Sequence, residues 1–498
     1  MLRFTFTLSA ISKQLILFVL LIAVQAASAR GQGVPTDLEG VVRASGPGAT
    51  VPVIIRLRDR VDAREIARDS KRRRQGLRSR RARLVRELKA QVDRRRYREL
   101  RRLLRERDAR RIRELWAINA VAAEVPAELV GELTSLPQVL SVRYDARLEE
   151  PTVSAAQSGM GRWNLEAVGA PQLWQLGWTG QGVVVATLDS GVDPFHPDLG
   201  PAWRGGGNSW FDPYAENPAP HDVSGHGTQV MGLILGGDSS GSTIGMAPDA
   251  SWIAAKIYDN SGVGTLSAIH ASLQWLLDPD GAPETDDAPD VVNNSWNLLN
   301  SVGDCDVEFQ DDLAALRAAE IAVVFAAGNS GPNASTSMSP ANNAPVRFAV
   351  GSVDQSSTLA SGSARGPSTC TGSFYPHVVA PGVNVESTGL TFGGLIPNSY
   401  EFVSGTSIAA PHVTGAFALL KSAVPGATLE ELETAMEETT LDLGTIGPDD
   451  QYGAGLIDVA AAHLSLSAGA VPALWGPWAA LLAGLLVARA WAALPQDR

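Results

Sequence analysis

Hydrophobic and polar positions alternate in two ways between residues 160 and 464 of this chain. Short, almost continuous apolar runs predict buried strands, and longer stretches with an apolar residue every three or four positions predict amphipathic helices. The apolar runs cover residues 182–189, 251–258, 290–296, 321–328 and 347–353. The helical patterns cover residues 264–278, residues 309–320 and the stretch after Ser407. Because such strands alternate with helices, we expect an α/β fold with a mostly parallel sheet covered by helices on both sides.

The region before this domain has a pattern that predicts a small domain of its own. Residues 51–58, 116–125 and 138–145 have the composition of strands. An arginine-rich stretch from Ala63 to Leu115 separates the first two and predicts a helix or helix pair. Its apolar positions form one stripe: Leu84, Leu88, Val92, Leu100 and Leu104. A helix that opens at Pro126 follows, with Leu129, Leu133 and Leu136 on it. The order strand, helix, strand, helix, strand favours a small ferredoxin-like α/β sandwich.

Charge is distributed unevenly between these two regions. Residues 30–150 contain 30 lysines and arginines against 18 aspartates and glutamates, whereas residues 151–498 contain 9 against 35. Opposite fields of this size favour docking of the basic region on the acidic one, more strongly at low salt. A nucleic-acid-binding segment is the alternative, but acidic residues interrupt the arginines and few aromatic residues could stack on bases. We therefore expect electrostatic docking and no nucleic acid partner.

Both ends of the chain carry apolar segments of the kind that direct export. Arg3 and Lys13 precede an apolar run and the small residues 27–29, which predicts a signal peptide over residues 1–29. Residues 466–498 contain a linker and an uncharged apolar run that ends at Arg489. The run is short for a full membrane span, yet it is apolar on all sides, which argues against packing on the protein surface. We expect a sorting or anchor segment with membrane contact, similar to the C-terminal sorting signals of Gram-negative bacteria, and an extracellular or cell-surface location.

The two cysteines, Cys305 and Cys370, both lie in the acidic region. In an exported protein they could form one disulfide that closes a long loop. The sequence does not show whether their Cα atoms approach within bonding distance, so a disulfide and two free thiols both remain open.

Three short windows contain the residue types of nucleophilic catalysis. Asp189 ends the apolar run VVVATLD, His226 lies in SGHGT, and Ser407 lies in SGTSIAAPHV. A serine is a weak nucleophile and needs a base to take its proton, and the base needs a carboxylate to hold its tautomer. His226 is the histidine set in Gly-His-Gly-Thr at the start of an apolar helical run, where small neighbours leave room for a substrate. We therefore predict an Asp189–His226–Ser407 triad.

Acyl transfer also needs donors for the negative oxygen that develops on the substrate carbonyl. Asn329 follows a predicted strand, in AAGNSG, and is our candidate for one donor. The backbone N–H of Ser407 at a helix N-terminus is the second. Asp189 and Asn329 both follow predicted strands, and sites in such sheets gather at the carboxyl ends of the strands.

In these windows the chain resembles the subtilisin-like serine proteases, or subtilases, and among them the bacillopeptidase F type. The order Asp, His, Ser along the chain is that of this family. The resemblance implies a catalytic domain over residues 151–465 and an inhibitory, basic propeptide over residues 30–150, removed by autocleavage around residues 150–160. Asn329 matches the oxyanion asparagine of the family.

The resemblance also implies positions for substrate and metal. The two walls of the S1 cleft would be residues 295–297 (Ser295, Trp296, Asn297) and residues 327–329 (Ala327, Gly328, Asn329). Trp296 and the lack of charge in these walls point to an apolar or broad P1 preference. The segment around Gly262 would pair with an extended substrate. Asp198 matches a calcium-binding position of some subtilases, although the loop that should complete that site differs. Residues 278–290 begin like a calcium loop but lack ligands at two positions, which favours a solvated loop.

These observations predict an exported endopeptidase made as a zymogen, with no cofactor in the chemistry and structural calcium possible. Its partners would be polypeptide substrates and its own propeptide. Two alternatives are a self-processing surface protein whose one substrate is its own propeptide, and an inactive binding scaffold on the same fold. The scaffold predicts erosion of the catalytic positions, and all four are present.

Overall fold

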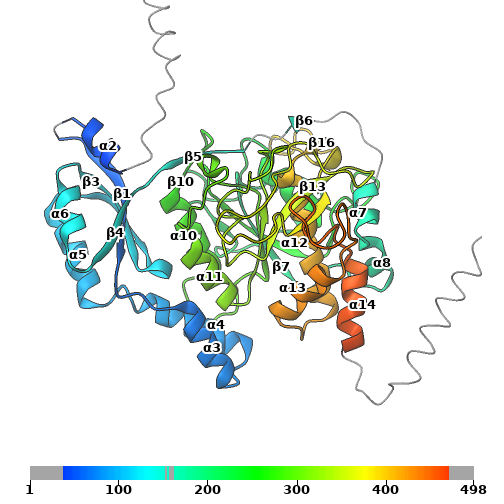
Figure 1. Cartoon of the computed structure of the whole chain (residues 1–498), viewed down its shortest axis with the longest axis horizontal. Coiled ribbons are helices and arrows are strands. Elements are labelled where there is room, and N and C mark those ends of the chain that lie inside the picture. Colours follow the sequence, from blue (N-terminus) through cyan, green and yellow to red (C-terminus); the bar gives the residue numbers. More distant parts are fainter. Residues whose placement is uncertain (1–37, 47, 152–153, 156–161, 470–498) are drawn as a thin grey trace, which may run out of the picture.

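Seven parallel strands form the central sheet of the larger of two domains (Figure 1). The computed structural model describes residues 38–469, apart from residues 47, 152–153 and 156–161. The sheet contains, from one edge to the other, β14 (Val378–Pro381), β13 (Phe348–Val353), β12 (Ala322–Ala326), β11 (Val291–Asn294), β7 (Val184–Asp189), β9 (Ser251–Lys256) and β8 (Trp210–Phe211). Every neighbouring pair is parallel. The five apolar runs of the sequence are five of these strands, so the predicted α/β architecture is confirmed.

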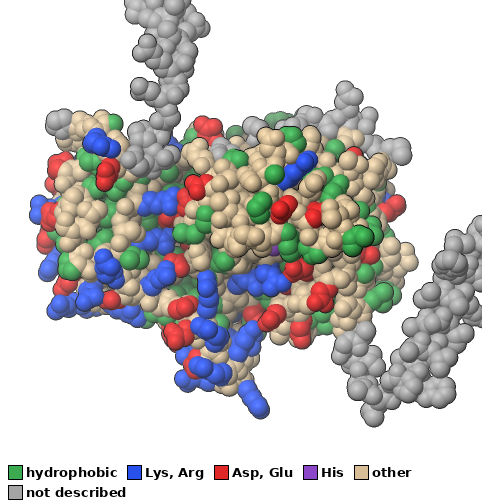
Figure 2. Space-filling view, viewed as in Figure 1, with side chains coloured by type: hydrophobic (Ala, Val, Ile, Leu, Met, Phe, Trp, Pro, Cys, Tyr) green, Lys and Arg blue, Asp and Glu red, His purple; other side chains and the backbone are tan. Residues whose placement is uncertain are grey.

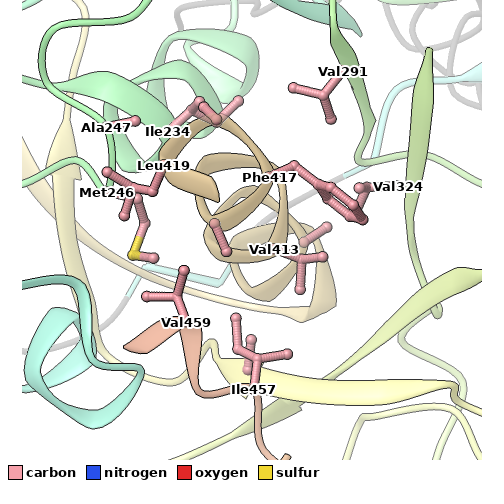
Figure 3. Close-up of a cluster of buried hydrophobic side chains, with 14 of the residues drawn as sticks. Ile234, Met246, Ala247, Val291, Val324, Val413, Phe417, Leu419, Ile457 and Val459 are labelled. Atoms are coloured by element: carbon pink, nitrogen blue, oxygen red, sulfur yellow. The ribbon is translucent and has the colours of Figure 1, made fainter. Parts of the chain in front are cut away.

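Helices cover both faces of this sheet because successive strand residues point to opposite sides. Val185 contributes to the core beneath α9 (His226–Leu235) and α12 (Thr406–Ala423). Its neighbour Ala186 contributes to the core beneath α10 (Leu266–Leu277) and α11 (Gln310–Ala318). Figure 3 shows α12 within the first core, with Phe417 pointing toward Val324 of β12. The remaining helices of the domain are α7 (Trp163–Ala167), α8 (Ala170–Gln175), α13 (Leu429–Glu438) and α14 (Val459–Gly469).

The small N-terminal domain is an antiparallel sheet with helices on one face, as predicted. Its strands lie in the ferredoxin-like order β2-β3-β1-β4. They are β1 (Thr50–Leu57), β2 (Arg110–Leu115), β3 (Ala120–Pro126) and β4 (Val139–Tyr144), and α2 (Leu38–Ala44) precedes them. Two details of the expectation were wrong. The end of the arginine-rich stretch is the strand β2, and Pro126 ends β3 instead of opening α6 (Leu129–Ser135).

The arginine-rich stretch forms three helices whose apolar residues serve two different cores. The helices are α3 (Ala63–Arg72), α4 (Leu77–Lys89) and α5 (Arg95–Glu106). Leu100 and Leu104 of α5 pack in the core of the small domain. Leu84 and Leu88 of α4 instead belong to the cluster that includes α10 and α11 of the large domain. The single stripe expected from spacing is therefore divided between the two domains.

Two short antiparallel sheets flank the catalytic windows. β5 (Arg147–Glu149) pairs with β10 (Val263–Thr265). β6 (Ser154–Ala155) pairs with β16 (Tyr400–Ser404), and β16 also pairs with β15 (Val385–Thr388). The chain that joins the two domains is thus held by a strand pairing on each side of residues 152–153.

Cys305 and Cys370 form a disulfide, which decides the question that the sequence left open. Among the described residues no helix is both long and apolar enough to cross a membrane. The predicted signal peptide (1–29) and the apolar run at 470–488 lie outside the described residues.

Candidate active site

Asp189 and His226 meet at the carboxyl edge of the central sheet. Asp189 is the last residue of β7, and His226 is the first residue of α9. The distance from His226 Nδ1 to Asp189 Oδ1 is 2.6 Å, and both side chains are buried. Asp189 Oδ1 also accepts a hydrogen bond from the backbone N–H of Ser190 (2.7 Å). These contacts hold the imidazole with Nδ1 directed at the carboxylate, so its Nε2 faces the other way.

His226 Nε2 and Ser407 Oγ are both buried, and neither has a hydrogen-bond partner among the described residues. Buried polar atoms normally have partners, so the lack of one leaves both atoms available to a substrate or to each other. Ser407 is the second residue of α12 and so lies in its first turn. Burial disfavours the charged imidazole, but the charge and hydrogen bond of Asp189 outweigh it and raise the pKa of His226.

Asn329 lies beside Ser407, with its amide orientation set by Thr406. The Oδ1 atom of Asn329 accepts hydrogen bonds from the backbone N–H and the hydroxyl of Thr406, both at 2.9 Å. This leaves the NH₂ group as the free end of the amide. A Cβ placed on Gly405 would lie 3.1 Å from Ser407 Oγ and 3.5 Å from Asn329 Nδ2. The nucleophile and the amide donor therefore flank the same Gly405 Cα, and a side chain there would crowd both.

A polar chain behind Ser407, which the sequence did not reveal, ties α12 to β11. Ser295 Oγ donates to the carbonyl of Ser407 (2.8 Å) and accepts from Asn293 Nδ2 (2.9 Å). Thr414 of α12 in turn donates to Asn293 Oδ1 (3.0 Å). Because Ser295 is buried in this chain, its side chain positions the nucleophile instead of facing a substrate.

Asp222 fixes the start of α9 in a similar way. Its carboxylate accepts hydrogen bonds from the backbone N–H groups of Gly225 (3.0 Å) and Thr228 (2.9 Å), which flank His226. Asp222 lies three residues before Gly225, the N-cap residue of α9, so an N-cap pattern does not point to it and the sequence predicts no role for it.

The expected walls of the S1 cleft lie next to each other. Asn297 Nδ2 donates to the carbonyl of Ala326 (3.1 Å), and a Cβ on Gly328 would lie 3.5 Å from Asn297 Oδ1. Ala327 is buried, and its carbonyl accepts from the hydroxyl of Tyr375.

Trp296 does not fit the role suggested by its position in these walls. Its side chain is 1% exposed and packs edge-on against Phe309 and Phe325 in the core. Trp296 therefore gives no support for an apolar P1 preference, and this basis for the preference was wrong.

The segment after Gly262 carries an extended partner already. In β10 it pairs with β5, and the carbonyl of Gly262 accepts from the backbone N–H of Glu150 (3.1 Å). The carboxylate of Glu150 reaches Ser224, two residues before His226. The predicted substrate edge is thus occupied by the chain that precedes residue 151.

Asp198 does not have the environment of a calcium ligand. Its Oδ1 accepts from the backbone N–H of Ser239 (2.8 Å), and its Oδ2 accepts from the hydroxyl of Tyr400 (2.7 Å). Both carboxylate oxygens already have protein donors, whereas calcium ligands present their oxygens to the ion. The acidic group with ligand spacing among the described residues is instead Asp278, Asp280 and Asp287.

His412, five residues after Ser407, points away from the site as expected. Its Nδ1 donates to the carbonyl of Ile408 (3.0 Å), and its Nε2 accepts from Asn164 (2.9 Å). Burial lowers the pKa of His412 to about 4, so the ring is neutral and already bonded at both nitrogens.

Comparisons with known proteins agree with this geometry. Residues 180–455 match the family described as "Subtilase family". Over 347 residues the chain is 36% identical to subtilisin E of Bacillus subtilis, which covers 69% of this chain and 81% of that protein. It is 34% identical over 362 residues to an alkaline protease of Alkalihalobacillus alcalophilus, with 70% and 84% covered. Bacillopeptidase F of Bacillus subtilis is 33% identical over 375 residues, which is 69% of this chain but only 26% of that longer protein.

Proposed function

Because this chain belongs to the subtilase family and is a serine endopeptidase, we propose that it cleaves polypeptides through an acyl-enzyme on Ser407. The observation that carries the proposal is the pair of buried, unpartnered atoms Ser407 Oγ and His226 Nε2, with Asp189 bonded to the far side of the imidazole. Acyl transfer by these groups requires no cofactor.

The roles of the three residues follow from what each atom can donate or accept. Ser407 Oγ attacks the carbonyl carbon of the substrate as His226 Nε2 takes its proton. Asp189 accepts the Nδ1 proton throughout and stabilises the imidazolium that forms. His226 then gives the proton to the leaving amine as the C–N bond breaks. Water, deprotonated by the same Nε2, attacks the ester and releases Ser407.

Asn329 and the backbone N–H of Ser407 would stabilise the negative oxygen of the tetrahedral intermediate. The orientation of Asn329 supports this role because Thr406 holds its Oδ1 and leaves its NH₂ free beside Ser407. Donors that are oriented before the reaction need no reorganisation during it, which is why such groups contribute strongly to rate.

The N-terminal domain would act as a propeptide that blocks the substrate cleft. β5 occupies the edge strand β10 in the antiparallel manner of an extended substrate. Its middle residue Leu148 is buried in a cluster with Tyr258, Leu266 and Ile269 of the large domain, which supports an apolar subsite on this side. Because β5 and β6 are paired on either side of the site, we place the autocleavage between Glu150 and Ser154.

Export and membrane attachment belong to the proposal on sequence grounds alone, since the signal peptide and the C-terminal segment lie outside the described residues. Calcium at Asp198 does not belong to it, because hydrogen bonds already occupy both oxygens of that carboxylate.

A fluorophosphonate probe tests the proposal directly, because it reacts with a serine that has an activating base. We expect the processed protein to be labelled, and Ser407→Ala to remain unlabelled and at full precursor length. N-terminal sequencing of the processed form should give a start between residues 151 and 154. Absence of Ser407-dependent labelling would contradict the enzymatic proposal. A labelled protein that processes itself but leaves unfolded casein intact would favour the self-processing alternative.

A further inference from the structure

A helical hairpin of the N-terminal domain, α3 and α4, holds the large domain at a place away from the substrate cleft. In Figure 1 the hairpin lies below α11, apart from the sheet of its own domain. The core of the N-terminal domain is filled by Tyr97, Leu100 and Leu104 of α5, and no residue of α3 or α4 belongs to it. The hairpin is therefore not required to close that core.

The apolar residues of the hairpin are buried against the large domain instead. Ile66, Leu84 and Leu88 are at most 5% exposed and share a cluster with Leu313 and Leu316 of α11. The same cluster contains Ile54 and Ile118 of the N-terminal domain, so the apolar residues of the hairpin form part of the interface between the two domains.

Basic residues surround these apolar contacts and reach the acidic domain. Arg81 is 7% exposed and donates to the carbonyl of Ala319 (2.8 Å) and to Asp286 (3.0 Å). Arg80 pairs with Glu320 at 2.6 Å. Further contacts join Lys71 to Glu320, Arg78 and Arg86 to Glu284, and Lys89 to Asp278 and Gly281. Figure 2 shows Lys and Arg side chains gathered over this hairpin, with Asp and Glu beside them.

This second contact lies at the opposite edge of the central sheet from the catalytic groups. Asp286 precedes β11, and Ala319 and Glu320 precede β12, so these partners lie at the amino ends of parallel strands. Asp189 and Asn329 lie at the carboxyl ends. At about 3.3 Å per residue, strands of four to six residues separate the two edges by roughly 15 Å. The hairpin and the cleft are therefore separate contacts of one polypeptide. Arg56 and Arg143 of the N-terminal sheet also join the two domains, through Glu308.

We propose that this hairpin is a second anchor, which keeps the severed propeptide bound after the junction is cut. The inference rests on the proposed zymogen function and adds how activation is controlled. A cut between Glu150 and Ser154 frees the end of β5, but the hairpin keeps that end at an effective concentration of about millimolar beside β10. The strand rebinds faster than substrate displaces it. Activity appears when the hairpin contacts are lost, by high salt or by proteolysis of the hairpin.

The experiment follows the propeptide after autoprocessing of the full chain. Wild-type protein and Arg81→Ala are analysed by gel filtration and by peptidase activity over time, at about 0.05 M and about 1 M NaCl. We expect wild-type propeptide to co-elute with the catalytic domain at low salt while activity stays low. Arg81→Ala should release it roughly ten- to a hundredfold faster, the effect of losing hydrogen bonds from a charged donor. Its junction should still be cut.

Arg95→Ala is the matched control. Among the described residues Arg95 on α5 has its ion pair with Glu99 of the same helix, and its side chain is 83% exposed. It should release the propeptide at the wild-type rate. Asp286→Asn removes the partner from the other domain and keeps the propeptide sequence intact, so a folding defect of Arg81→Ala can be recognised. In the double variant the two effects should be less than additive.

Uncleavable Ser407→Ala precursor supplies a readout that does not depend on autoprocessing. Hydrogen exchange of the α3 and α4 amides should speed up in the Arg81→Ala background while β5 stays protected. The second anchor is refuted if wild-type propeptide leaves as soon as the junction is cut, or if Arg81→Ala and Arg95→Ala behave alike. Absence of labelling and of cleavage would refute the zymogen function instead, and the exchange measurement would still judge the anchor.

Discussion

Two buried histidine–carboxylate pairs lie in the described part of the large domain, and they differ in the surroundings of the second ring nitrogen. His226 bonds to Asp189 through Nδ1, and its Nε2 has no partner among the described residues. His270 in α10 bonds to Asp312 through Nδ1 (2.8 Å) and to Glu308 through Nε2 (2.9 Å). Both rings are buried, so burial and a carboxylate partner do not distinguish them. The difference is the free nitrogen.

A second difference between the two histidines is the number of carboxylates that hydrogen-bond to each ring. Burial disfavours the imidazolium of His270, but Asp312 and Glu308 outweigh it and raise its pKa to about 9. This favours the cationic ring at neutral pH, a state in which it cannot accept a proton. Arg56 and Arg143 of the N-terminal domain also contact Glu308 (both 2.9 Å), so His270 belongs to a charge network that joins the domains. A histidine beside an aspartate can therefore act as a base only where its second nitrogen is free to accept a proton.

Replacing each histidine in turn by glutamine should give the largest difference between the two pairs. His226→Gln removes the base, and we expect kcat/KM to fall by at least about 10⁴-fold with little loss of stability. His270→Gln should leave kcat/KM of folded enzyme nearly unchanged. It should lower the free energy of unfolding by about 3 kcal/mol, because two buried carboxylates lose a cation. Circular dichroism of each variant measures the folded fraction independently of the catalytic base. A reversed pattern would mean that the roles are exchanged.

Asp189 and Asp312, the carboxylates of the two pairs, should also differ in their effect on activity. Asp189→Asn keeps the shape but no longer favours the tautomer with the proton on Nδ1, so we expect kcat to fall by about 10⁴-fold. Because Asp189 raises the pKa of His226, we expect the acid limb of the pH–rate profile of the parent enzyme at a higher pH than an unperturbed histidine would give. In Asp189→Asn it should move to lower pH. Asp312→Asn is the control, and a shift of its acid limb would contradict the separation of the two pairs.

The proposed catalytic groups could be picked out in the sequence because each combines a residue type with a local pattern. Asp189 and Asn329 follow apolar strands, and His226 and Ser407 begin helices. The roles of Asn293, Ser295 and Thr406 were not predictable, since their hydrogen bonds join segments from 77 to more than 100 residues apart. Such partners depend on how strands and helices are arranged in space.

The fold was predictable where apolar periodicity was strong. The prediction was wrong where a residue faces the second domain. Leu84 and Leu104 have the spacing of one stripe, but they enter different cores because the chain turns between α4 and α5. β2 was missed because it carries Arg110, Arg111 and Arg113, and charged residues are unusual in a strand. Trp296 was misjudged because an aromatic residue beside a cleft can point into the core.

Asn329→Ala tests the proposed oxyanion donor beside Ser407, a group that has no counterpart among the described residues that contact His270. Loss of one oriented oxyanion donor should lower kcat by about 10²- to 10³-fold with KM nearly unchanged. Thr406→Val removes one of the two hydrogen bonds that orient the amide, and we expect a smaller loss of roughly fivefold. Steady-state kinetics on a peptide substrate measure both losses. A rise in KM with kcat unchanged would instead indicate a role in ground-state binding.

The smallest expected effect is the pH dependence that His270 gives to stability. Its folded pKa of about 9 lies above the unfolded value of about 6.5, so its contribution is complete below pH 6.5 and is lost as pH rises through 9. The size of the shift corresponds to about 3 kcal/mol. Asp312, Glu308 and, at longer range, Asp145 are the acidic groups that act on it. Urea unfolding of the Ser407→Ala precursor should therefore show a midpoint that falls between pH 6.5 and pH 9.5. In a Ser407→Ala, His270→Gln double variant that fall should be largely absent, and an equally steep decline there would assign the pH dependence to other groups.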